Sequence, residues 1–194
     1  MPPPLLLLGG TFDPPHIGHL FLAECTRAQF GGRVVFLPAG DPWRKTTGAV
    51  GGRRELTPAA LRLEMVRLAV RGNRAFSVDD REVRRAGPSY TVDTLRELRA
   101  EGDADLVLIV GSDALADMPN WREAAAIPEL ARVAVALKAG AEVALPAWAT
   151  AVEMPPLPVS STLIRSRAAA GLPIRYLVPE PVRRFIAREG LYRA

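Results

Sequence analysis

The chain contains one cysteine, Cys25, and this scarcity limits the chemistry available to it. A lone cysteine can form neither an intramolecular disulfide nor a cysteine-based zinc site, which agrees with a reducing compartment. Histidine is also scarce: His16 and His19 are the only two. Because both lie in one short segment, we find no Ser/His/Asp or Cys/His set for nucleophilic catalysis.

Long apolar runs are missing as well. No stretch approaches the roughly 20 apolar residues that span a bilayer. The four leucines at positions 5–8 are too few for the apolar region of an export signal, and no charged segment precedes them. We therefore expect a cytoplasmic protein that needs no membrane partner.

Lysine is rare, and the positive charge comes almost entirely from arginine. Lys45 and Lys138 are the only lysines, and the net charge is +4. Nucleic-acid binding normally requires a clustered basic face, whereas this modest excess suits a small polyanion. We expect small-molecule ligands and no nucleic acid.

What is present is an ordinary globular composition, with 48% hydrophobic and 24% charged residues among 194. That length suits one α/β domain. Apolar strand-like runs alternate with amphipathic segments, which predicts a doubly wound parallel sheet with helices on both faces. The expected strands cover 5–8, 34–38, 76–78, 106–110 and 133–137, and the expected helices cover 18–30, 58–72, 91–100, 124–130, 160–170 and 181–188.

Two connecting segments carry less regular patterns. Residues 39–56 combine several glycines with arginines and Lys45, which indicates a long, mobile basic loop. Thr57 is the expected N-cap of the helix that follows it, with Pro58 at the first helical position. Residues 139–158 are too rich in proline for us to assign an element.

The two histidines follow the first expected strand and a Gly9-Gly10 turn, where a helix should begin. Backbone N–H groups, the helix N-terminus and two imidazole donors can converge there on one anion. Gly18 lies between the histidines, and its lack of a side chain lets a phosphate approach the backbone. In a parallel sheet, ligands bind beyond the carboxyl ends of the strands, so this turn predicts a nucleotide-phosphate site.

Two segments together resemble the paired signature of the HxGH nucleotidyltransferase superfamily. These are residues 10–19, Gly-Thr-Phe-Asp-Pro-Pro-His-Ile-Gly-His, and residues 160–165, Ser-Ser-Thr-Leu-Ile-Arg. Three further stretches are similar to those of bacterial nicotinate-mononucleotide adenylyltransferases: residues 88–95, residues 111–113 followed by Trp121, and the tail 177–182 ending in 190–192. The resemblance runs nearly end to end and implies a Rossmann-like nucleotidyltransferase domain over 1–194, with the helical segment 160–194 packed on it.

That family joins ATP and nicotinate mononucleotide to form nicotinate adenine dinucleotide and pyrophosphate, with Mg²⁺. The substrate's phosphate attacks the α-phosphorus of ATP, so the protein needs to supply only alignment and positive charge. The expected catalytic residues are His16, His19 and Arg165, with Arg165 facing the leaving pyrophosphate. The expected ATP-binding residues are Gly10, Thr11, Phe12, Gly18, Gly111, Asp113, Ser160, Ser161 and Thr162.

The resemblance also implies a mononucleotide site. Trp121 would stack on the pyridine ring. The backbone N–H groups of Tyr90 and Thr91 would donate hydrogen bonds to the nicotinate carboxylate. A lysine in the basic loop would reach a phosphate. Here Pro42-Trp43-Arg44-Lys45 departs from the usual Pro-Pro-His-Lys, which leaves the division of labour between Arg44 and Lys45 open.

Several alternatives stay open at this point. Asp113 could hold ribose hydroxyls or merely cap the next helix, and Asp13 could brace the histidine turn. Magnesium is implied by the nucleotide, without an assigned protein ligand. Rival activities are a nicotinamide-mononucleotide or dual-specificity enzyme, a phosphopantetheine adenylyltransferase, and a non-catalytic nucleotide-binding protein. The oligomeric state is open, with a homo-oligomer possible.

Overall fold

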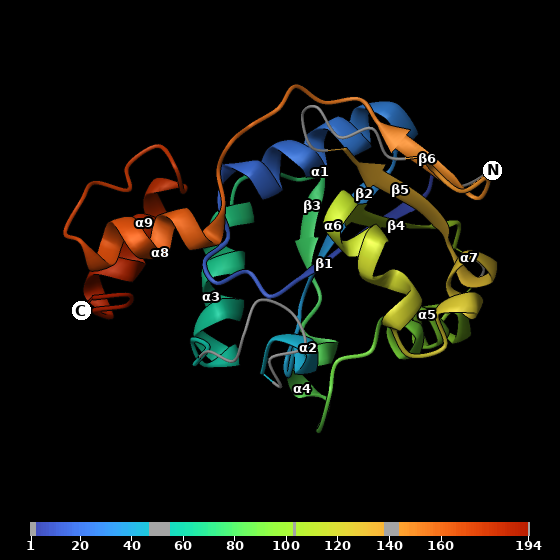
Figure 1. The fold of residues 1–194 in the computed structure, drawn as a ribbon, viewed down its shortest axis with the longest axis horizontal. Coiled ribbons are helices and arrows are strands. Elements are labelled where there is room, and N and C mark those ends of the chain that lie inside the picture. Colours follow the sequence, from blue (N-terminus) through green and yellow to red (C-terminus); the bar gives the residue numbers. More distant parts are fainter. Residues whose placement is uncertain (1–2, 47–54, 103, 138–143, 194) are drawn as a thin grey trace.

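The computed structural model describes residues 3–46, 55–102, 104–137 and 144–193. Its centre is a parallel six-stranded sheet in the order β3-β2-β1-β4-β5-β6 (Figure 1). This confirms the predicted α/β class and every predicted strand. The strands are β1 (Leu5–Gly10), β2 (Arg33–Pro38), β3 (Phe76–Val78), β4 (Leu106–Gly111), β5 (Arg132–Ala136) and β6 (Ala149–Val152).

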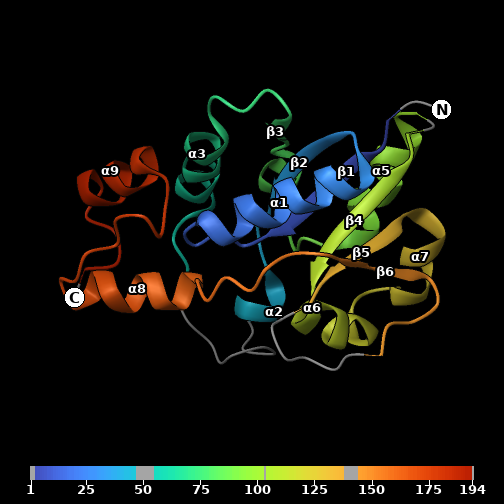
Figure 2. The same ribbon diagram turned by 90° about the horizontal axis from the view of Figure 1, so that it is seen from above.

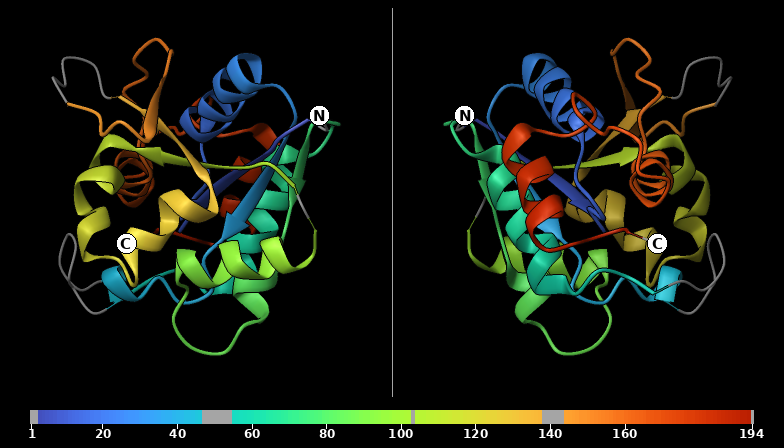
Figure 3. Two further views of the ribbon diagram at one scale, coloured as in Figure 1. Left: turned by 90° about the vertical axis from the view of Figure 1, so that its right-hand side faces the viewer. Right: turned by 90° about the vertical axis from the view of Figure 1, so that its left-hand side faces the viewer.

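Helices cover both faces of the sheet, as Figure 3 shows most clearly. One face packs against α1 (Ile17–Phe30) and α3 (Ala59–Val70), and the other against α5 (Thr91–Ala100), α6 (Ser112–Asp117) and α7 (Ile127–Leu130). Side chains alternate between the faces of a strand. Leu6 and Leu8 of β1 therefore join the cluster under α1, whereas Leu7 joins the cluster under α5. Burial on both faces explains why this strand is uniformly apolar.

The two C-terminal helices, α8 (Ser161–Ala169) and α9 (Glu180–Arg188), lie beside α3 at one end of the sheet (Figures 1 and 2). Met65 of α3 packs there with Ile164, Val182 and Phe185 in a third apolar cluster. The segment between β6 and α8 runs past α1 on its way to this end (Figure 2). Residues at positions 160–165 are thereby brought next to the turn that follows β1.

The structure contains elements that the sequence did not predict. They are α2 (Trp43–Thr46), α4 (Arg81–Arg84), α6, the 3₁₀ turn η1 (Met118–Asn120), and β6. The predicted helix 124–130 is present as the 3₁₀ turn η2 (Ala124–Ala126) followed by α7. The expected loop 39–56 is therefore helical in part, while its positions 47–54 lie outside the described residues. Strand β6 was not predicted because its short sequence of alanine, threonine and valine carries no clear strand pattern. Its pairing with β5 determines its conformation instead.

The predicted N-cap of α3 was wrong. Pro58, rather than Thr57, precedes the first helical residue, and no side chain caps this helix. The Thr57 carbonyl instead accepts a hydrogen bond from Arg62 Nε at 2.9 Å. Within the described ranges, no helix has both the length and the apolar character needed to cross a membrane.

Candidate active site

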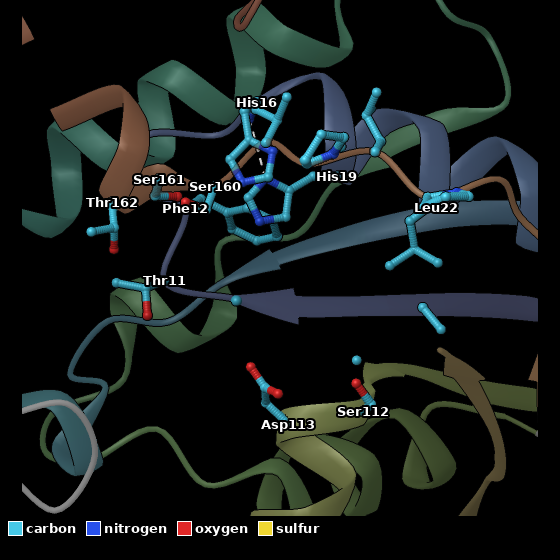
Figure 4. A pocket seen from close by; sticks show the side chains of 18 of the residues that line it. Thr11, Phe12, His16, His19, Leu22, Ser112, Asp113, Ser160, Ser161 and Thr162 are labelled. Carbon is cyan, nitrogen blue, oxygen red and sulfur yellow. Dashed lines mark hydrogen bonds between the residues drawn. The ribbon is translucent and has the colours of Figure 1, made fainter. Parts of the chain in front are cut away.

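A cavity of about 1100 Å³ opens at the carboxyl ends of β1, β4 and β5 (Figure 4). Its lining comes from the turn after β1, the start of α6, and the segment that leads into α8. Every residue predicted to be catalytic or to bind ATP lines this one cavity. They are Gly10, Thr11, Phe12, His16, Gly18, His19, Gly111, Asp113, Ser160, Ser161, Thr162 and Arg165.

Phe12 packs against His19 within the histidine turn, the segment after β1 that carries His16 and His19. Its φ of 50° is left-handed, and its ring is buried against the edge of His19, with centroids 5.0 Å apart. A Cβ at Gly10 would lie only 3.1 Å from this ring. Glycine at position 10 therefore allows the phenylalanine to fold under the turn.

His16 and His19 stack on each other, with ring centroids 3.7 Å apart. The backbone N–H of His16 donates to His19 Nδ1 at 3.1 Å. An accepting Nδ1 has no proton, so the neutral His19 ring carries its proton on Nε2. A Cβ at Gly18 would approach His16 Nδ1 to 3.0 Å, so Gly18 makes room for the stacked rings as well as for a ligand.

Burial controls the charge of His16. Its side chain is largely enclosed, and desolvation lowers the pKa of His16 from 6.5 to about 4. His16 is therefore neutral at physiological pH. A neutral imidazole can donate or accept a hydrogen bond but adds no positive charge to the site.

This burial predicts a pH-dependent stability. The unfolded imidazole binds a proton near pH 6.5 but the folded one only near 4, so the unfolded state holds more protons between these values. Stability is then fully present above 6.5 and declines as the pH falls toward 4. His16 alone should reduce the free energy of unfolding by about 2 kcal/mol between pH 7 and pH 5.

Urea unfolding at the two pH values, for the wild type and for His16→Gln, measures this effect. The variant removes the titrating group, so its stability should change less with pH than that of the wild type. Equal changes in both proteins would contradict the assignment.

The start of α8 is joined to the histidine turn by hydrogen bonds. Ser161 Oγ donates to the Pro14 carbonyl at 2.8 Å, and Arg165 Nη1 donates to the Asp13 carbonyl at 2.7 Å. Arg165 Nη2 also donates to Thr162 Oγ1 at 3.2 Å. Ser160 caps the helix by accepting from the Leu163 N–H at 3.1 Å. Ser160 thus caps the helix and also lines the cavity, as Thr162 and Arg165 do.

Asp113 lies on the opposite side of the cavity from the two histidines (Figure 4). The N-cap of α6 is Gly111, and no side chain caps this helix. Asp113 therefore does not occupy the N-cap position, although it is an acidic residue in the first turn of the helix. Its carboxylate instead lines the cavity in the first turn of α6.

Sequence reasoning missed two residues that hold the turn in place. Tyr192, near the C-terminus, donates from its hydroxyl to Asp13 Oδ1 at 2.6 Å, and desolvation together with the Asp13 charge raises the pKa of Tyr192. Arg62, only 1% exposed, donates to the carbonyls of Thr11 and Ala39 at 2.8 and 2.7 Å. The tail motif Gly190-Leu191-Tyr192 could have indicated a role for Tyr192. No motif in the sequence indicated a role for Arg62.

Of the predicted mononucleotide residues, Arg44, Tyr90, Thr91 and Trp121 are not among the described residues that line the cavity. Trp121 packs partly against the core cluster, and its Nε1 donates to Asp117 Oδ2 at 3.1 Å. Arg44 forms an ion pair with Asp117, and Tyr90 lies 5.9 Å from the Trp43 ring. We call Trp43, Arg44, Tyr90, Asp117 and Trp121 the aromatic cluster. Thr91 is the first residue of α5, and the side chain of Lys45 lies outside the described residues.

Metal ligands are sparse in this site. Among the residues that the structure describes, no group of three or more His, Cys, Asp or Glu side chains is arranged to hold a metal ion.

Comparison with known proteins agrees with this geometry. The model of the cytidylyltransferase-like family matches residues 7–167. A probable nicotinate-nucleotide adenylyltransferase of Thermomicrobium roseum is 46% identical over 199 residues, covering 96% of this chain and 90% of that protein. A probable enzyme of the same name from Roseiflexus sp. is 44% identical, with 98% of each chain covered.

Solved structures share the fold. The Plasmodium falciparum nicotinic acid mononucleotide adenylyltransferase complexed with NaAD has a TM-score of 0.79 at 15% identity, covering 97% of this chain and 96% of that one. A putative nicotinate-nucleotide adenylyltransferase from Vibrio parahaemolyticus has a TM-score of 0.68 at 20% identity, covering 97% and 94%.

Proposed function

Because this chain belongs to the nicotinate-nucleotide adenylyltransferases of the cytidylyltransferase-like family, we propose that it transfers the adenylyl group of ATP to nicotinate mononucleotide in NAD biosynthesis. The products are nicotinate adenine dinucleotide and pyrophosphate. One observation supports this most strongly: the histidine turn and α8 line a single cavity and are joined by the hydrogen bond from Arg165 to Asp13.

Within this proposal, the residues bind and align two phosphate-bearing substrates. The phosphate oxygen of the mononucleotide attacks the α-phosphorus of ATP, and the bond from that phosphorus to the bridging oxygen of pyrophosphate breaks. His19 donates from Nε2 to an ATP phosphate oxygen, and the neutral His16 supports it. Thr162 and Arg165 receive the β- and γ-phosphates, where negative charge develops as pyrophosphate leaves.

The adenosine part of ATP would lie toward the other side of the cavity. Gly111 ends β4 without a side chain, so a ribose can approach the backbone. The Asp113 carboxylate can accept from ribose hydroxyls. This arrangement points the triphosphate at the histidine turn and at α8.

The aromatic cluster would take the nicotinate mononucleotide. A pyridinium ring over the Trp121 indole gains roughly 0.5 to 2 kcal/mol. The first N–H groups of α5, at Thr91 after Tyr90, have no intrahelical partner and can donate to a carboxylate. A carboxylate only accepts hydrogen bonds, so such a row of donors favours the acid over the amide.

The ion pair between Arg44 and Asp117 supports a division of roles between Arg44 and Lys45. Arg44 is engaged by Asp117, so it would support the site rather than bind a phosphate. Lys45, at the next position of α2, would then carry the positive charge toward a phosphate. We propose Mg²⁺ as the accompanying ion, bound to ATP oxygens and water; it would neutralise the developing charge. The location proposed for the protein is the cytoplasm, and a homo-oligomer is possible.

The experiment that tests this function measures pyrophosphate release from ATP and Mg²⁺ with nicotinate or nicotinamide mononucleotide at matched concentrations. We expect a preference for the acid of at least about tenfold in kcat/KM, because the amide NH₂ would face N–H donors. A reaction that contains neither mononucleotide is the control for ATP hydrolysis. Equal rates would favour a dual-specificity enzyme and would contradict the carboxylate site at Tyr90 and Thr91.

If neither mononucleotide led to pyrophosphate release, the proposed acceptor substrate would be wrong. Release with phosphopantetheine would then identify a phosphopantetheine adenylyltransferase. Binding of ATP without release with any acceptor would indicate a non-catalytic nucleotide-binding protein.

A further inference from the structure

Asp117, at the last residue of α6, is the centre of a hydrogen-bond network that the proposed reaction does not yet explain. Its Oδ2 accepts from Trp121 Nε1 at 3.1 Å. Its Oδ1 accepts from Asn120 Nδ2 at 3.2 Å and forms the ion pair with Arg44 Nη2. One carboxylate therefore joins the indole of Trp121 to a guanidinium that is distant in the sequence.

Arg44 brings a second element into this network. Its side chain is 19% exposed, its Cζ lies 5.2 Å from the Trp43 ring centroid, and its Nη1 donates to the Asn120 carbonyl at 3.4 Å. The segment just before α2 is also fixed, because the Ser89 N–H donates to the Asp41 carbonyl at 2.9 Å. Helix α2 is thus held between the segment that leads into α5 and the end of α6.

The Asp117 carboxylate is charged under ordinary conditions. Partial desolvation raises its pKa, but hydrogen bonds from Asn120, Trp121 and Arg44 outweigh that effect and hold the pKa below its usual range. A charged acceptor makes stronger hydrogen bonds than a neutral one. The indole has a single N–H donor, and its χ2 torsion is intrinsically broad. A charged partner at Nε1 therefore restricts the plane of the ring.

We propose that Asp117 is a positioning residue for the nicotinate mononucleotide, which orients the Trp121 indole and fixes α2 beside it through Arg44. This inference rests on the proposed function, since it assumes that Trp121 stacks on the pyridine ring. Stacking depends on the relative orientation of the two rings, so an indole that rotates offers the substrate less favourable contact. Asp117 touches no reacting atom and acts on the substrate through Trp121, while Arg44 helps to hold the Asp117 carboxylate in place.

The test compares Asp117→Asn, Trp121→Phe and the double variant. Asparagine keeps the size of the side chain and removes its charge, whereas phenylalanine keeps a ring and removes Nε1–H. Asp117→Asn should raise the KM for nicotinate mononucleotide about tenfold, while kcat and the KM for ATP change less than about twofold. Calorimetric titration with nicotinate mononucleotide alone should show a matching loss of affinity.

The double variant separates positioning from a general structural effect. If Asp117 acts through the indole, the two substitutions must be non-additive, and the double variant should bind the mononucleotide nearly as well as Trp121→Phe. Asp105→Asn is the matched control, because Asp105 forms an ion pair with Arg132 at the amino ends of β4 and β5. Its kinetic constants should equal those of the wild type.

Two outcomes would overturn the inference. One is an unchanged KM for nicotinate mononucleotide in Asp117→Asn, and the other is a double variant whose loss equals the product of the two single losses. Failure of the proposed function is distinguishable, because the wild type would then release no pyrophosphate with nicotinate mononucleotide.

Discussion

Replacing Arg165 with alanine is expected to slow adenylyl transfer by about two to three orders of magnitude while the protein remains folded. Arg165 lines the cavity on the first turns of α8, next to the histidine turn. In the proposed reaction its guanidinium faces the pyrophosphate, which gains negative charge as it leaves. A charge contact that strengthens in the transition state affects kcat more than substrate binding.

The fold should tolerate this change because Arg165 is only partly buried, whereas the buried residue that anchors α8 in the core is Ile164. The hydrogen bond from Arg165 to the Asp13 carbonyl is lost, but Ser161 still joins α8 to the turn through Pro14. Steady-state pyrophosphate release gives kcat and KM, and thermal unfolding checks the fold. Arg165→Lys should recover only part of the rate, because lysine lacks the planar fork of donors.

Arg167→Ala is the matched control on the same helix. Arg167 Nε donates to the Pro173 carbonyl at 2.9 Å, and the residue does not line the cavity. Its turnover should stay within about twofold of the wild type. Near-normal turnover in Arg165→Ala, or equal losses in both variants, would remove Arg165 from the leaving-group role.

Replacing Arg62 with leucine is expected to reduce the free energy of unfolding by about 3 to 5 kcal/mol. This arginine of α3 is 1% exposed and donates to four backbone carbonyls. They belong to Thr11 after β1, to Ala39 and Gly40 after β2, and to Thr57 before α3. Leucine fills part of the volume but leaves these acceptors without their donors, and a buried polar group without a partner is costly.

Chemical denaturation of the wild type and of Arg62→Leu measures this loss. Arg62→Lys should lie between them, because a single ammonium group cannot reach all four carbonyls. Arg67→Leu on the same helix is the control: its ion pair with Asp80 is exposed, so about 1 kcal/mol or less is expected. Equal stabilities of Arg62→Leu and Arg67→Leu would show that the network around Arg62 contributes little.

The sequence sufficed for features that depend on neighbouring residues. Strands β1 to β5 and most helices were predicted from local periodicity, and the histidine turn from a glycine pair followed by His16 and His19. Residues of a turn or a single helical turn are close in space because they are close along the chain. The grouping at one end of the sheet was also predictable, since the carboxyl ends of parallel strands share an edge. The resemblance at 10–19 and 160–165 added the reaction, which composition and spacing could not specify.

The tertiary structure alone decided the contacts between distant residues. The Tyr192 hydroxyl reaches Asp13 across 179 positions, and Arg62 reaches the Thr11 carbonyl across 51. Arg44 and Asp117 are separated by 73 positions, so no local pattern could show that this ion pair would engage Arg44. Such pairs form only when the packed sheet and helices bring two side chains within hydrogen-bond distance. Local sequence thus determined which groups gather at the cavity, whereas global packing determined what holds those groups in place.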